Sequence, residues 1–195
     1  MTSQPARADA VRNRQKILAA ARDSFAEEGT EASLDAIARR AGVGPGTLYR
    51  HFPNRDALIA ELLASELGDL AQTFASLKVS ALSPEDRLDS WATALVRYMT
   101  SYAGLPEPLR AAMGGRKTPL SLRCEVVIGW TEELVDAAKR AGLVKDFVTG
   151  REFYRAVLGV AWAASDAGTS DAGSVDAMLR INRNGWRADA PETSE

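Results

Sequence analysis

The stretch SLDAIARRAGVGPGTLYRHF, residues 33–52, places three glycines and a proline between two short segments that favour helices. Glycines beside basic residues can form a phosphate-binding loop, a catalytic turn or a bend between helices. A phosphate-binding glycine loop follows a strand and opens a long helix, whereas GVGPG follows a helical segment with no βαβ pattern around it. The stretch therefore favours a bend between two helices.

Ala38 and Gly42 explain how such a bend is built. Two helices that cross steeply need a small residue where their axes approach, and Ala38 provides it. The turn needs a residue that tolerates positive φ, which Gly42 does. Leu48 then contributes to the apolar contact between the helices. The pattern predicts a helix-turn-helix over 33–52, with residues 45–52 as its second helix.

The polar side chains of that second helix suit a nucleic acid. Once Leu48 and Phe52 face inward, the hydroxyls, guanidinium and imidazole of the remaining residues point outward, as donors for phosphates and base edges. Glycines at the start of the helix allow it to approach the floor of a major groove closely. We expect the DNA interface to contain Ser33, Gly44, Gly46, Thr47, Tyr49, Arg50, His51 and Arg55.

Composition excludes several other classes of protein. The 195 residues are 46% hydrophobic, carry a net charge of −2 and include one cysteine, Cys124, and one histidine, His51. A disulfide within the chain, a cysteine-based metal site and a multi-histidine metal site are therefore excluded, and no catalytic set of acid, base and nucleophile converges. We expect no cofactor, no enzyme activity and, because no apolar run approaches ~18 residues, no membrane span and a cytoplasmic location. Two roles remain open for the His51 side chain, structural packing and DNA contact. Its position in the second helix of the helix-turn-helix favours DNA contact.

Apolar residues recur at three and four positions throughout, so the expected fold class is all-α. A first helix is expected at 9–28, with Val11, Leu18, Ala21 and Phe25 on one face, and a long fourth helix at 54–77 after an Asn54 cap. A further helix opens at Ser83, a short segment surrounds 109–113, and later helices are expected at 119–141, 149–165 and 174–186. Two domains follow, a three-helix head at 1–55 and a larger helical domain at 56–195.

These residues resemble the tetracycline-repressor (TetR) family of bacterial transcriptional regulators. The resemblance rests on ILAAARDSFAEEG (17–29), the stretch at 33–52 and PNRDALIAEL (53–62), about the first third of the chain. It implies a DNA-binding head and a helical domain for ligand and dimer. By the same implication Tyr49 and His51 touch phosphates, while Gly46, Thr47 and Arg50 face the groove. Arg50 stands where an aromatic residue often precedes the histidine, a difference that bears on base preference.

The C-terminal two-thirds carries no comparably specific motif. Its aromatic and methionine residues fit a plain core, and the alternative is that some of them line a ligand cavity. The candidates for such a cavity are Trp91, Tyr98, Tyr102, Met113, Trp130 and Tyr154. No buried charge is evident there, so the expected effector is a largely apolar or aromatic small molecule.

Helices 149–165 and 174–186 are expected to form a two-fold homodimer. The first is rich in small residues, with Gly159 and Ala163 four apart, which permits close approach of another helix. The function expected from the whole chain is a repressor released from a palindromic, double-stranded operator by a small molecule. The alternative is a helical interaction module without a ligand switch.

Overall fold

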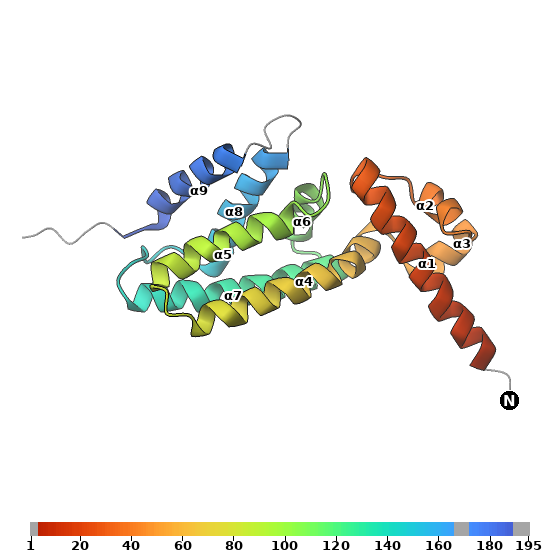
Figure 1. Ribbon diagram of the computed structural model, residues 1–195, viewed down its shortest axis with the longest axis horizontal. Helices are drawn as coiled ribbons and strands as arrows, with labels where there is room; N and C mark the ends of the chain where they lie inside the picture. Colours follow the sequence, from red (N-terminus) through yellow and green to blue (C-terminus); the bar gives the residue numbers. More distant parts are fainter. Residues whose placement is uncertain (1–3, 166–171, 189–195) are drawn as a thin grey trace, which may run out of the picture.

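The computed structural model describes residues 4–165 and 172–188, which form helices joined by short turns (Figure 1). The all-α prediction is confirmed: in this part of the chain the single β-type pairing is an isolated bridge between Val144 and Arg187. The helices are α1 (Gln4–Glu28), α2 (Leu34–Arg40), α3 (Pro45–His51), α4 (Arg55–Val79), α5 (Pro84–Met99), α6 (Pro106–Ala112), α7 (Pro119–Arg140), α8 (Gly150–Ser165) and α9 (Ala172–Trp186).

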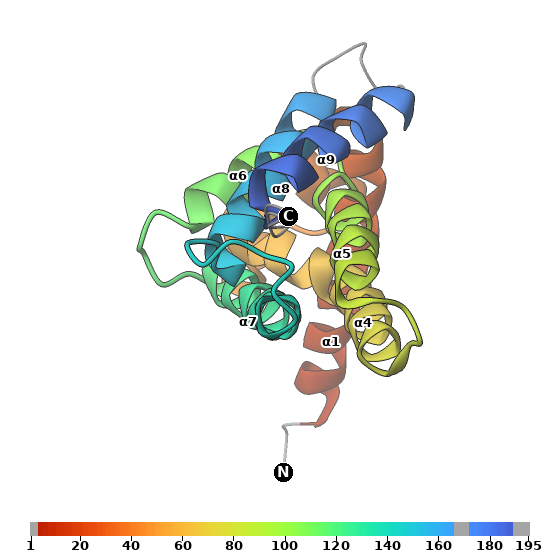
Figure 2. The same ribbon diagram turned by 90° about the vertical axis from the view of Figure 1, so that its left-hand side faces the viewer.

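The helices form a small head and a larger C-terminal domain (Figure 1). Helices α1, α2 and α3 pack against one another in the head, and α4 leads from it into the second part. There α4, α5, α8 and α7 form a ring in which each helix packs against the next, with α6 and α9 on the flanks (Figure 2). In the described residues no helix is both long and apolar enough to span a bilayer.

Side-chain caps set several helix starts where the sequence predicts them. Ser33 Oγ accepts a hydrogen bond from the Ala36 backbone amide at 3.4 Å, and Asn54 Oδ1 accepts one from Ala57 at 2.9 Å. Ser83 Oγ does the same for the start of α5. Because each cap satisfies an amide that has no partner within the helix, the three starts are fixed locally.

The first helix differs from its prediction. It begins at Gln4 rather than near Asp9, and Val11, expected on the buried face, is exposed. Ile17, Ala21 and Phe25 are fully buried, so the apolar face begins farther along the helix. The cause is visible in Figure 1, where the N-terminal turns of α1 extend past α2 and α3 and have no partner helix to cover them.

The head meets the C-terminal domain at the turn after α1. The Thr30 backbone amide donates a hydrogen bond to the Ala103 carbonyl at 2.8 Å, and the Phe25 ring contacts the Tyr102 ring edge-on, 6.1 Å between centroids. Gly29 has a φ of 77°, and a Cβ there would lie 2.8 Å from the Ala103 carbonyl oxygen. Glycine is therefore required at this junction for both its conformation and its size.

Candidate DNA-binding surface and ligand cavities

Helix α3 presents one face to the head and the other to solvent. Leu48 is fully buried and Phe52 is nearly so, and they anchor the helix against α1 and α2. Gly42 has a φ of 67° in the turn before α3, as a helix-turn-helix bend requires. Tyr49, on the outward face, has 45% of its surface exposed. The helix-turn-helix predicted at 33–52 therefore stands on the surface, with the expected face outward.

Gly46, at the start of α3, has no structural reason within the described part of the protomer, whereas Gly44 is the N-cap of the helix, a position that suits glycine. Neither Gly44 nor Gly46 has a positive φ, and a Cβ at either position would meet no atom within 4 Å. Glycine nevertheless costs up to ~1 kcal/mol in a helix interior relative to alanine. We expect that the advantage of glycine at Gly46 comes from a surface outside the protomer.

Arg50 lies along the outer face of α3. Its Nε donates to the Gly46 carbonyl at 3.0 Å, and its Nη2 donates to Thr47 Oγ1 at 3.1 Å. The guanidinium is solvent-exposed and rests over the first turn of the helix. These contacts bring Gly46, Thr47 and Arg50, three of the sequence-predicted residues, together at one point of the surface.

Arg55 and His51, two further predicted DNA contacts, lie partly against the protein itself. Arg55 Nη1 donates to the backbone carbonyls of Thr30 and Ala32, the latter at 2.7 Å, so it ties α4 to the turn between α1 and α2. His51 is partly buried, its ring 6.5 Å from that of Phe52, at the edge of α3 nearest α4. Their phosphate contacts stay predictions, and Arg55 also has a structural contact that its sequence position did not reveal.

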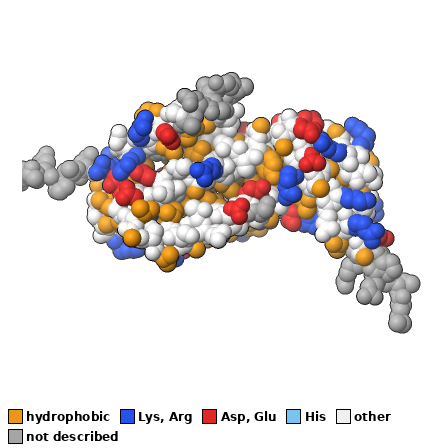
Figure 3. Space-filling model, in the orientation of Figure 1, with side chains coloured by type: hydrophobic (Ala, Val, Ile, Leu, Met, Phe, Trp, Pro, Cys, Tyr) orange, Lys and Arg blue, Asp and Glu red, His pale blue; other side chains and the backbone are white. Residues whose placement is uncertain are grey.

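The basic residues of the head divide into paired and unpaired groups. Arg40 makes two hydrogen bonds of 2.6 Å to Glu27, which tie α2 to α1 and lower the pKa of the Glu27 carboxyl. Arg50 and Arg39 form no ion pair among the described residues. Figure 3 shows lysine and arginine side chains on the surface of the head, at the right-hand end of the view.

Most of the aromatic residues considered for a ligand cavity lie in the core. Trp91 is fully buried and its Nε1 donates to Thr131 Oγ1 at 2.9 Å, while Trp130 stacks on Phe74 with centroids 5.5 Å apart. Tyr102 contacts the head, as described above. The plain-core alternative therefore accounts for Trp91, Trp130 and Tyr102.

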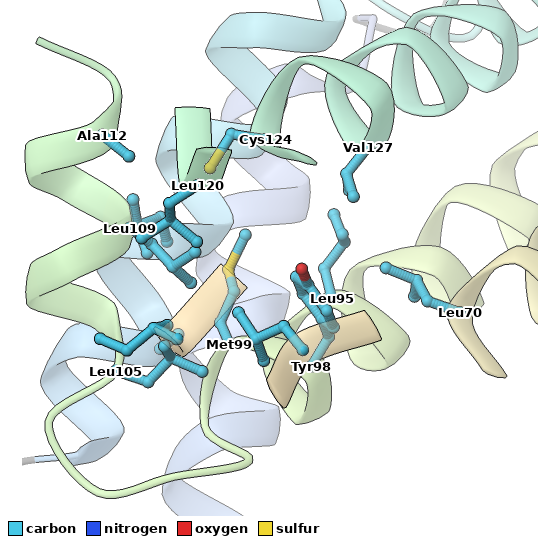
Figure 4. Close-up of a cluster of buried hydrophobic side chains, with 14 of the residues drawn as sticks. Leu70, Leu95, Tyr98, Met99, Leu105, Leu109, Ala112, Leu120, Cys124 and Val127 are labelled. Atoms are coloured by element: carbon cyan, nitrogen blue, oxygen red, sulfur yellow. The ribbon is translucent and has the colours of Figure 1, made fainter. Parts of the chain in front are cut away.

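Tyr98, Tyr154 and Cys124 are buried in the same apolar region, and Tyr98 and Cys124 lie among leucines in Figure 4. The Tyr154 hydroxyl lies 3.7 Å from Cys124 Sγ. Burial raises the pKa of both tyrosines and of the thiol. The thiol is thus neutral and enclosed, which agrees with a core role for Cys124 rather than a reactive one.

A cavity of about 640 Å³ lies between α6 and α8. This is within the ~300–1,000 Å³ usual for small-molecule sites. Pro106, Met113, Leu158 and Trp162 form apolar walls, and Arg155 lies at the rim. Met113 is the one sequence-predicted ligand residue among its lining. Tyr98 instead lines a smaller cavity of about 300 Å³ beside α4 and α5.

Comparison with known proteins covers both parts of the chain. Residues 17–62 match the model for bacterial regulatory proteins of the tetR family, and this range runs from the second half of α1 to the first turns of α4. Residues 83–188, over half of the chain, match the SbtR-like transcriptional regulator C-terminal domain. The chain belongs to the TetR family.

Individual relatives agree with this assignment. The TetR transcriptional regulator SCO0520 from Streptomyces coelicolor is 33% identical, with 91% of this chain and 99% of that one covered and a TM-score of 0.58. A TetR-family regulator from Agrobacterium tumefaciens is 17% identical, with 92% of this chain and 100% of that one covered and a TM-score of 0.61. At this identity the likeness shows a shared fold and no more.

The HTH-type transcriptional regulator SAB2452 of Staphylococcus aureus is 40% identical over 73 residues, 37% of this chain. The chain spans only 40% of the length of that curated relative. The matched family and relatives are transcriptional regulators, not enzymes, so this TetR-family chain is a bacterial DNA-binding transcriptional regulator.

Proposed function

We propose that this TetR-family regulator is a dimeric repressor that binds a palindromic operator and releases it when a small molecule occupies the C-terminal domain. The observation that carries the DNA-binding part is the glycine start of α3. A Cβ at Gly46 would meet no atom within 4 Å in the protomer, and the residue stands beside the Arg50 and Thr47 donors. A first helical turn without a bulky side chain, next to side-chain hydrogen-bond donors, can approach base edges closely.

The dimer is proposed through α8 and α9. A single head makes few base contacts, whereas a two-fold pair of heads reads both halves of a palindrome. Ala156 and Gly159 form an outward, small-residue stripe on α8, and Ile181 on α9 has 71% of its surface exposed. A second copy of these two helices would cover the isoleucine and make a four-helix contact.

The cavity between α6 and α8 is the proposed effector site, in place of the buried aromatic cluster. Its apolar walls favour an apolar or aromatic body, and the exposed guanidinium of Arg155, which lines the cavity together with the Glu107–Arg110 ion pair, favours a negative or polar end. Within the described residues Arg155 forms no hydrogen bond or ion pair, so a ligand would not have to displace an existing partner.

A route from this cavity to the head runs through α6. Pro106 lines the cavity at the first residue of α6, directly after the loop that contacts the head. In that loop the Ala103 carbonyl accepts a hydrogen bond from Thr30, whose own carbonyl accepts one from Arg55 at the start of α4. A ligand that moves α6 would therefore shift the turn between α1 and α2. To act, it must bind the DNA-free form more tightly, because equal affinity for both forms shifts nothing.

A gel-shift assay with the DNA upstream of the chain's own gene tests the regulator as a whole. For the effector, small molecules are screened for quenching of tryptophan fluorescence, and binders are tested for release of that DNA. We expect quenching to be lost in Trp162→Phe, whose indole lines the cavity, and kept in Trp130→Phe, whose indole stacks on Phe74 elsewhere. If every tight binder leaves DNA affinity unchanged, the ligand switch is wrong although DNA binding stands.

A further inference from the structure

A second cavity, of about 450 Å³, lies where the head meets the C-terminal domain on the side of α7. Its walls come from α1, the end of α3, α4 and the first turns of α7. It shares no lining residue with the cavity between α6 and α8. We refer to it as the head crevice.

Two arginines in the head crevice approach the same carboxylate without satisfying their donors. Arg14 Nη2 lies 3.2 Å from Glu61 Oε1, and Arg123 Nη2 lies 3.8 Å from Glu61 Oε2. Among the described residues neither arginine donates a hydrogen bond, and Arg14 Nη1 is buried with no acceptor. The Arg14 guanidinium lies against the Phe52 ring, 4.7 Å from its centroid.

Other arginines of the chain show what a satisfied pair looks like. Arg40 makes two hydrogen bonds of 2.6 Å to Glu27, and Arg183 lies 2.8 Å from Glu85 and 2.6 Å from Asp89. A guanidinium has five donors, and a buried donor without an acceptor is costly. One carboxylate shared between two arginines therefore leaves guanidinium donors that a second anion could accept from.

Apolar surface lies next to these unused donors. Leu122 and Val126, one turn apart on α7, have 58% and 45% of their surface exposed, and both line the head crevice. The charged and titratable groups facing the crevice are Arg14, Arg123, His51 and Glu61, so cationic groups outnumber the carboxylate. An occupant must therefore be an anion at one end and apolar at the other.

We infer that the head crevice is a binding site for a small amphipathic anion, a carboxylate or phosphate with an aliphatic body, held between Arg14 and Arg123. The anion fills the unused guanidinium donors, and its aliphatic part covers Leu122 and Val126. Glu61 competes with it for the same arginines. Because Arg14 belongs to the head and Arg123 to the C-terminal domain, the bound anion contacts both. This site is separate from the proposed effector cavity, and its test does not require DNA binding.

Isothermal titration of the full chain with three probes tests the inference. Octanoate carries both features, 1-octanol lacks the charge, and acetate lacks the chain. We expect saturable binding of octanoate, at least about tenfold weaker binding of octanol, and no measurable binding of acetate, since charge-assisted hydrogen bonds and apolar burial both contribute. Equal affinity for octanoate and octanol, or no saturable octanoate binding, overturns the site.

Three variants locate the site. Arg123→Met keeps the aliphatic stem and should weaken octanoate binding at least about tenfold, whereas Arg39→Met, at an exposed arginine of α2 that lines neither cavity, should leave it unchanged. Glu61→Gln removes the competing carboxylate and should strengthen binding several-fold, an effect that general destabilisation does not produce. Unfolding temperatures accompany each titration, and Arg14→Met serves if Arg123→Met does not fold. Octanoate affinity that is unchanged in Arg123→Met or in Glu61→Gln, or lost in Arg39→Met, contradicts the inference.

Discussion

The Gly46→Leu variant is expected to fold as stably as the wild type or more so, and to lose at least about a hundredfold in operator affinity, ~2.7 kcal/mol. In the free protomer a Cβ at Gly46 would meet no atom within 4 Å, so we expect the substitution to be accommodated on the exposed face of α3. Leucine also favours a helix over glycine by up to ~1 kcal/mol. On the operator the same side chain would stand between α3 and the base edges, where there is no space for it.

Thermal unfolding and fluorescence anisotropy with labelled operator measure the two effects separately. Gly129→Leu is the matched control, because Gly129 is also exposed on a helix and a Cβ there would meet no atom within 4 Å, but it lies on α7 away from the head. We expect this control to retain wild-type operator affinity. A Gly46→Leu protein that binds as tightly as the wild type would place the operator contact elsewhere.

The Ile181→Glu variant is expected to be monomeric and to bind operator weakly. Ile181 is exposed in the protomer, so the protomer itself has no reason to unfold. In the proposed dimer the glutamate would be buried near its two-fold copy, and burying unpaired charge costs several kcal/mol. Loss of the dimer removes one of the two heads from the palindrome and with it most of the binding free energy.

Sedimentation velocity of the variant, with the wild type beside it, measures the change. Val79→Glu is the control, since Val79 has 86% of its surface exposed at the end of α4, outside α8 and α9. We expect this control to sediment like the wild type. An Ile181→Glu protein that stays a dimer shows that α9 is not at the interface.

The features that the sequence predicts well are those decided by neighbouring residues. The helix-turn-helix needs Ala38, Gly42 and Leu48 within about ten positions, and the caps at Ser33 and Asn54 act three residues along the chain. Each of these depends on helix geometry, which repeats locally and can be read from spacing. The family resemblance in the first third rests on the same residues, and the matched family models confirm it.

The features that were missed depend on contacts between distant segments. The DNA contact of Arg55 stays a prediction, but the hydrogen bonds from its Nη1 to the Thr30 and Ala32 carbonyls could not be read from its position in the sequence. Helical spacing could place Trp91 and Tyr154 on inward faces but could not separate a core position from a cavity wall. The shared carboxylate at Glu61 joins α1, α4 and α7, and no local pattern brings its two arginines together.

Selection of duplexes from a random-sequence library by the purified chain tests the central claim most directly, because the operator sequence emerges from the selection itself. A dimer that reads DNA through two α3 helices should recover an inverted repeat whose half-sites are centred about one helical turn, ~34 Å, or a multiple of it apart. Binding to the recovered sequence should weaken steeply and linearly in log salt as counterions are released. Recovery of no consensus, or of one without two-fold symmetry, would contradict the account.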